Sequence, residues 1–118
     1  MFYYVKKNNV ISINRGDYVE IPFKFEEGKF PKTPITMNDG DVLFFGLMDP
    51  NMHFEHSLIK KEFTGKDTIS SEGEFTLILE PDDTLELLPG TYFYEIKLLT
   101  KDAKIKTLIQ KTRFNIID

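Results

Sequence analysis

Two histidines and a glutamate are the residues of this chain best suited to chemistry. His53 and His56 stand three positions apart, with Glu55 between them. On a helix, imidazoles at this spacing share one face and could hold a metal ion. The preceding Asp-Pro-Asn-Met segment and the strand expected afterwards disfavour a helix, and the order differs from the His-Glu-x-x-His of zinc proteases. We therefore expect an exposed loop here, with no metal and no other cofactor.

Three polar segments match or approach binding motifs. The tripeptide Arg-Gly-Asp at positions 15–17 matches the integrin-binding sequence, but a match of three residues is frequent by chance, and a polar turn before a strand is favoured. The acidic segments 38–41 and 80–83 could offer oxygen ligands to calcium. Their spacing matches no complete calcium loop, so ordinary turns are expected.

The sequence contains no enzyme signature. None of its four serines lies in a Gly-x-Ser-x-Gly elbow, and no glycine-rich phosphate loop is present. The chain has no cysteine, which excludes disulfides, thiolate chemistry and cysteine-based zinc sites. We therefore expect a non-enzymatic protein without catalytic residues.

Length and charge narrow the class further. The 118 residues, 41% of them hydrophobic, suit one domain spanning positions 1–118. The net charge of −4 and the pI near 5.2 argue against a nucleic-acid partner, because phosphate binding needs clustered positive charge. The start of the chain does not have the pattern of a signal peptide, and no apolar run is long enough to span a membrane.

Alternating apolar and polar residues predict strands over 18–25, 73–79 and 92–98. The turn-rich segments between them, with a strand expected about every ten residues, predict an all-β fold. More specifically, the pattern is typical of an immunoglobulin-like antiparallel β-sandwich of about seven strands. The expected inward-facing core includes Val19, Ile21, Phe23, Phe75, Leu77, Tyr94 and Ile96.

Other segments carry more local predictions. Residues 42–48 are strongly apolar, which favours a central strand covered on both faces, and residues 105–110 with 113–117 favour one long, bulged strand. Pro22 cannot donate to a ladder and indicates an edge strand or a bulge. Residues 84–88 could form one helical turn capped by Asp82 or Asp83.

Two further features concern turns and edges. The segment Leu-Pro-Gly at 88–90 predicts a type II turn with positive φ at Gly90. Lys60 and Lys61 are expected on or near the exposed face of a strand over 57–63, where their charges would disfavour pairing of a sheet edge with another chain.

The aromatic residues are too many to point into one core. Of Phe44 and Phe45, one should face outward if residues 42–48 form a strand. A surface patch could dock a protein partner, including a second copy of the chain, or stack a sugar ring; alternatively, the rings cover each other across strands. The candidate interaction surface consists of Phe2, Tyr3, Tyr4, Tyr18 and Phe93.

The order of these features resembles a known group of proteins. The segments in question are an Arg-Gly-Asp-Tyr turn at 15–18, Asn-Asp-Gly-Asp-Val-Leu-Phe-Phe-Gly-Leu at 38–47, the strand and acidic turn at 73–84, Leu-Pro-Gly-Thr-Tyr-Phe-Tyr-Glu-Ile-Lys-Leu at 88–98 and the final strand at 107–116. Together they resemble the small immunoglobulin-like modules of phage and prophage structural proteins, and most nearly the N-terminal domain of baseplate upper proteins from phages of Gram-positive bacteria.

The resemblance implies a fold and a role, but no functional residue is carried over from it. It implies a structural component of a virion (tail, baseplate or head-associated) that acts through protein–protein contacts. Such a component would lie in the host cytoplasm during assembly and afterwards in the virion. The alternative from the residues themselves is a carbohydrate-binding module that uses exposed aromatic side chains.

Overall fold

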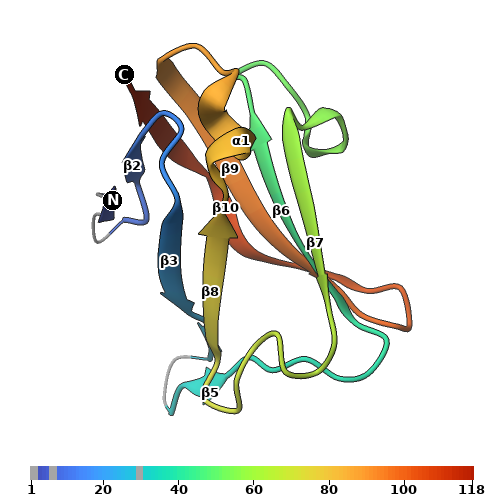
Figure 1. The fold of residues 1–118 in the computed structure, drawn as a ribbon. Coiled ribbons are helices and arrows are strands. Elements are labelled where there is room, and N and C mark those ends of the chain that lie inside the picture. The colour runs from blue at the N-terminus through green and yellow to red at the C-terminus, as the bar shows by residue number, and fades with distance from the viewer. Residues whose placement is uncertain (1–2, 6–7, 29–30) are drawn as a thin grey trace.

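The computed structural model describes residues 3–5, 8–28 and 31–118. The fold is all-β, with one short α-helix and one short 3-10 turn among these residues. A large curved sheet faces a smaller sheet, as Figure 1 shows. No helix in the described part of the chain is long and apolar enough to cross a bilayer.

The larger sheet has six strands in the order β1-β2-β10-β9-β6-β7. All neighbours are antiparallel except β2 and β10, which run parallel. This arrangement confirms the central position predicted for the apolar strand β6, which lies between β7 and β9. The strands are β1 (Tyr3–Val5), β2 (Ile11–Asn14), β6 (Val42–Met48), β7 (Ile59–Thr64), β9 (Gly90–Leu99) and β10 (Ile105–Ile117).

The smaller sheet contains β3 (Val19–Lys24) and β8 (Glu74–Leu79), which pair antiparallel. A hairpin of two-residue strands, β4 (Glu26–Glu27) and β5 (Thr33–Pro34), follows β3. The described residues thus form ten strands, more than predicted, because the count includes these two and the three-residue β1.

Strand alternation places the core as the sequence predicts. Val19, Ile21 and Phe23 of β3 are buried, as are Phe75 and Leu77 of β8. These side chains pack against the inner face of β9, where Tyr94 and Ile96 are also buried, so the predicted core is confirmed. Burial of two facing rows of apolar side chains is the main force that holds the sheets together.

Tyr94 is the largest fully buried side chain of the described core, and it carries a polar hydroxyl into the interior. Its hydroxyl donates a hydrogen bond of 2.6 Å to the carbonyl oxygen of Asn9, which satisfies the buried phenol. Burial raises the pKa of the Tyr94 phenol above its ordinary value.

Three local predictions are resolved by the backbone. The long final strand is confirmed, with register shifts near Ile109. The helical turn begins earlier than predicted: α1 spans Pro81–Leu85 with Glu80 at its N-cap, because proline favours the first helical position. The predicted positive φ of Gly90 is confirmed, but its value of 155° is far from that of a type II turn, so the predicted turn type is wrong.

Candidate functional site

The two sheets are closed against each other on one side of the molecule and open on the other. On the closed side, the rings of Phe63 in β7 and Phe75 in β8 meet edge to face, with centroids 5.1 Å apart. Lys61 of β7 also forms a 2.8 Å ion pair with Asp83 of α1. On the opposite side, a hollow of about 290 Å³ lies between β3 and the first half of β10. We call this hollow the side groove.

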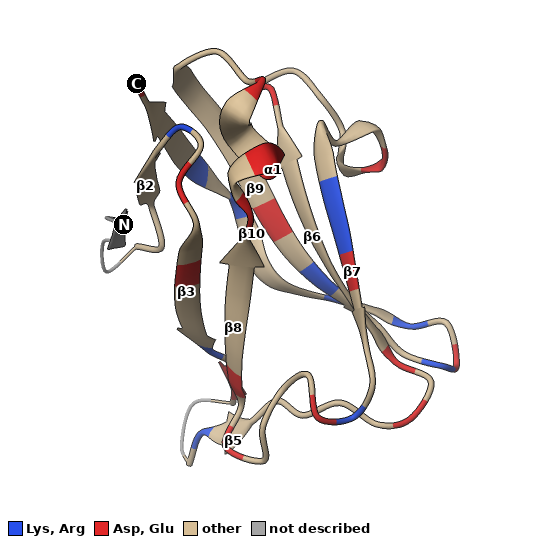
Figure 2. Cartoon of the chain, in the orientation of Figure 1, with Lys and Arg blue, Asp and Glu red and all other residues tan. Residues whose placement is uncertain are grey.

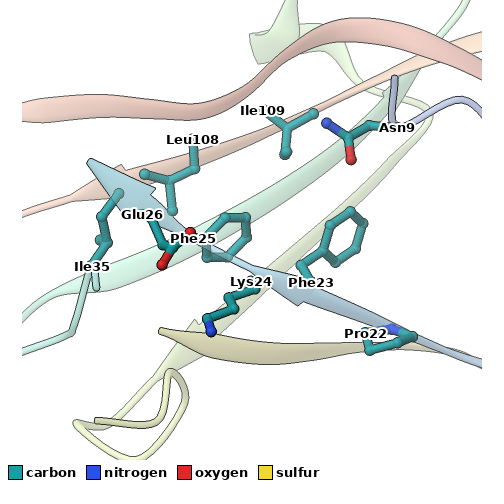
Figure 3. A pocket seen from close by; sticks show the side chains of 9 residues that line it. All are labelled: Asn9, Pro22, Phe23, Lys24, Phe25, Glu26, Ile35, Leu108 and Ile109. Carbon is teal, nitrogen blue, oxygen red and sulfur yellow. The ribbon is translucent and has the colours of Figure 1, made fainter. Parts of the chain in front are cut away.

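Apolar side chains from both sheets line the side groove. Figure 3 shows Phe23 and Phe25 lying beneath Leu108 and Ile109, which point down from β10. Leu108 and Ile109 are consecutive, yet both line the groove, because the β9–β10 register shifts between Thr107 and Ile109. A bulge of this kind turns a side chain that strict alternation would place on the other face. The side groove is therefore an opening into the core.

Within the described residues, the backbone of β3 has an open edge at the side groove. The N–H of Phe25 donates to the carbonyl of Gly73 at 2.8 Å, which directs Phe25 toward the β8 side. Alternate residues of a strand direct their backbone groups to alternate sides, so Lys24 and Pro22 face away from β8. Pro22 has no N–H and removes one donor from this edge. The prediction of an edge strand at Pro22 is confirmed.

The first half of β10 also has an open edge. Its pairing with β2 covers only Phe114 to Ile117, so the part from Ile105 to Arg113 has no second strand partner within the described residues. The chain approaches this gap at Asn9, whose φ is +68°, and then enters β2 beside the end of β10. The side groove thus lies between two strand edges that could accept hydrogen bonds from a further strand.

The predicted interaction residues are not gathered on one surface. Phe2 lies outside the described residues, and for Tyr3 and Tyr4 the structure describes only the backbone, which pairs with β2. Tyr18 is exposed, and its hydroxyl donates to Glu20 on the outer face of the smaller sheet. Phe93 alternates with buried tyrosines and lies on the outer face of the larger sheet. Tyr18 and Phe93 therefore lie on opposite outer faces.

The motif residues have mainly structural contacts. The guanidinium of Arg15 forms a 2.8 Å ion pair with Asp118 and donates to the carbonyl of Leu85. The backbone N–H of Gly16 donates to the hydroxyl of Thr84. These contacts join the 15–18 turn to α1 and to the end of β10, as expected for a structural turn rather than a presented recognition loop.

The two histidines lie in an exposed turn, the 3-10 segment η1 (Phe54–His56) and the residue before it. Within the ranges that the structure describes, no three histidine, aspartate or glutamate side chains gather into a possible metal site. The absence of a metal or cofactor stays a prediction.

Sequence reasoning missed the side groove and a second hollow on the outer face of β6. Of the two phenylalanines of β6, Phe45 is fully buried and Phe44 faces outward, which the alternation left open. The signals in the sequence were Gly46 inside an apolar strand and the adjacent apolar pair Leu108 and Ile109 in a strand that otherwise carries many polar residues.

Comparison with known proteins does not place the chain in a family. No protein-family model matches it, and no curated protein sequence matches it.

Proposed function

We propose that this domain is a non-enzymatic interaction module that binds an extended segment of a partner protein in the side groove. The observation that carries the proposal is the hollow of about 290 Å³ between the open edges of β3 and β10. An added strand would satisfy backbone groups at these edges, and one of its apolar side chains would enter the hollow. The partner can be a second copy of the chain or another protein.

The shape of the groove supports a peptide rather than a small molecule. The hollow is at the lower limit of volumes that hold drug-sized ligands. Its lining combines the hydrocarbon of Phe23, Phe25 and Leu108 with the polar residues Asn9, Lys24 and Glu26, and more of the exposed wall is polar than apolar, unlike the mainly apolar wall of a typical small-molecule pocket. Backbone donors and acceptors along two strand edges instead match the repeating polar groups of an extended chain.

We further infer that the domain is an immunoglobulin-like sandwich of a phage or prophage structural protein. The strand order, with β2 parallel to β10 and the pair β3–β8 facing the larger sheet, supports the first part. The second part rests on the sequence resemblance alone. It would place the protein in the host cytoplasm during assembly and then in a virion tail, baseplate or head, and tail or capsid genes beside its gene would support it.

Carbohydrate binding is the alternative function. A sugar-binding surface needs two or three exposed aromatic rings in one plane or groove. Tyr18 and Phe93 lie on opposite faces, and the outward-facing rings of Phe44 and Phe54 are nearly perpendicular, at 87°. We therefore favour the protein partner. Binding on a glycan array that Phe44→Ala or Tyr18→Ala abolishes would reverse this choice.

A selection with random linear peptides displayed on yeast tests the proposal. Lys24→Pro removes a backbone donor from the open edge of β3, and Leu108→Asp puts a charge into the hollow. Thr76→Pro is the matched control, because Thr76 pairs opposite Pro22 and directs its N–H to the other edge of the same sheet. Circular dichroism verifies that each variant is folded.

The expected result is a set of peptides that bind the original chain and Thr76→Pro but neither Lys24→Pro nor Leu108→Asp. Amide signals of β3 and β10 should shift when these peptides are added in NMR titrations. Peptides that bind all folded variants equally, or a failure to enrich any peptide, would overturn the proposal. Sedimentation of the chain at high concentration separates self-association from binding to another protein.

A further inference from the structure

A turn folded over the outer face of the larger sheet forms a second hollow, on the face of the molecule that points away from the core. Residues 49–57 connect β6 to β7 and cross above Gly46 of β6. Lys111 of β10 holds this connection by donating to the carbonyls of Pro50 and Met52 at 3.0 and 3.3 Å. Ser57 donates to the backbone carbonyl of Phe54, which stabilises the turn that carries the Phe54 ring.

The hollow beside Phe54 has apolar walls. It has a volume of about 180 Å³ and is lined by Phe44 of β6, Phe54, Leu99 of β9 and Ile105 of β10. Ile105 is 67% exposed, which is unusual for a large aliphatic side chain on a strand. The water-facing side of a sheet normally carries polar residues, so an apolar hollow at this place indicates a contact surface.

Two lysines cover the aromatic wall of the hollow. The ammonium of Lys60 lies 5.4 Å from the ring centre of Phe44 and 5.3 Å from that of Phe54, and the ammonium of Lys97 lies 4.8 Å from Phe54. Figure 2 shows blue, basic segments on β7 and on β9, the two strands that flank β6 in the larger sheet. Cation–π contact holds both ammonium groups beside the apolar walls.

The lysines are available to an anionic partner. Within the described residues, Lys60 has no carboxylate within ion-pair distance, and Lys97 has only Glu95, at 3.9 Å. Glu55 also lines the hollow. The pKa of its carboxyl is lowered, mainly by a hydrogen bond from its own backbone N–H. The hollow therefore has apolar walls, and its lining also includes two ammonium groups and one carboxylate.

We propose that this outer-face hollow binds a protein segment in which one apolar side chain is followed by a carboxylate. A dry cavity of comparable size holds one benzene ring, so the hollow has room for a single leucine, isoleucine or phenylalanine side chain. The carboxylate would meet Lys60 and Lys97. The proposal concerns a different surface from the side groove and does not depend on the function proposed there.

NMR titration of the full chain with blocked tetrapeptides tests this site. The probes are acetyl-Gly-Leu-Glu-Gly-amide and two matched versions, one with glutamine in place of glutamate and one with glycine in place of leucine. The glutamate peptide should shift the ring signals of Phe44 and Phe54 and the methyl signals of Ile105. It should bind about fivefold more tightly than the glutamine peptide at low salt, with a smaller difference at high salt.

Variants assign the effect to the two lysines. The double variant Lys60→Gln, Lys97→Gln should bind the two leucine peptides equally, whereas Glu55→Gln should keep the preference for glutamate. Lys24→Pro, at the side groove, should bind as the original chain does, so failure at one site is distinguishable from failure at the other. Equal binding of the glutamate and glutamine peptides to the original chain would overturn the proposal, as would shifts that map away from Phe44 and Phe54, or no shifts.

Discussion

The ring of Phe54 lies so close to Gly46 that no side chain fits between them. A Cβ added to Gly46 would be 2.7 Å from Cε1 of Phe54 and 2.5 Å from the hydroxyl of Ser57. The glycine in the middle of a central strand thus creates the space in which the 49–57 turn packs on the sheet. Without this glycine, the outer face of β6 could not hold Phe54 in its position.

Gly46→Ala should therefore displace the turn. We expect a loss of about 1–3 kcal/mol in the free energy of unfolding, measured by urea denaturation, because overpacking forces the ring and the hydroxyl to move. The ring signals of Phe54 should also shift in NMR spectra. In a Phe54→Ala, Ser57→Ala background the same substitution should cost clearly less. An equal cost in both backgrounds would show that the contact does not set the preference for glycine.

Phe75 is expected to be among the most sensitive positions of the core. Its ring contacts those of Phe23, Phe25 and Phe63, with centroids 5.1–6.4 Å apart. Phe75→Ala should cost about 3–5 kcal/mol in urea denaturation, and Phe23→Ala should fall at the lower end because Phe23 borders the side groove. Thr76→Ala, on the exposed face of the same strand, should stay within about 0.5 kcal/mol. A loss below about 1 kcal/mol for both phenylalanines would contradict this packing.

Asp83 makes two contacts on the side where the two sheets are closed against each other. Its carboxylate accepts the backbone N–H of Glu80 at 2.7 Å and pairs with Lys61 at 2.8 Å. Asp83→Ala should lose about 1–2 kcal/mol, since both the helix cap and the half-buried ion pair disappear. Lys61→Met should lose less, because the cap remains. The exposed neighbour Asp82 provides the control, and a comparable loss for Asp82→Ala in thermal melts would argue against the specific role of Asp83.

Tyr94 should make the domain sensitive to alkali. Because the pKa of Tyr94 is raised in the folded state, its contribution to the free energy of unfolding is complete below about pH 10, the ordinary pKa of tyrosine in the unfolded chain. Above that pH the unfolded chain ionises while the folded phenol stays protonated, and stability falls as pH rises. Tyr94→Phe should flatten this fall between about pH 10 and 12, although it costs about 1 kcal/mol at neutral pH by leaving the Asn9 carbonyl without its donor.

Urea denaturation at a series of pH values measures this effect. Tyr18→Phe is the comparison: hydrogen bonding to Glu20 raises the pKa of Tyr18, but solvent screens this exposed side chain. The alkaline slope should therefore change less than in Tyr94→Phe. Identical slopes in the original chain and Tyr94→Phe would refute the argument.

Deletion of residues 1–5 tests whether the aromatic start of the chain is an assembly element. In the structure the backbone of β1 pairs with β2 of the same chain, through three residue pairs at the edge of the sheet. We therefore expect the shortened chain to fold and to keep the oligomeric state of the original chain in light scattering. A smaller mass for a still-folded shortened chain would show that this segment docks on a neighbouring copy instead.

The sequence predicts the strands well and the surfaces poorly, for a physical reason. Alternation over 18–25, 73–79 and 92–98 records directly which face of each strand is buried, because successive side chains point to opposite faces. The side groove depends instead on which strands are not paired, and the place of Phe54 depends on Gly46 of the preceding strand and on Lys111, which is far from it in sequence. Local periodicity contains neither relationship.

The parallel pairing of β2 with β10 has a consequence for how the domain forms. Ser12 and Asn115 hydrogen-bond across a separation of 103 positions, and β2 joins the larger sheet only through β10. Strands β1 and β2 must therefore wait for β10, which is made later, before they have a place in the sheet. Such long-range closure is typical of slow folding. During translation β2 would stay exposed until β10 leaves the ribosome, and in this period it is open to chaperones or to a neighbour's strand.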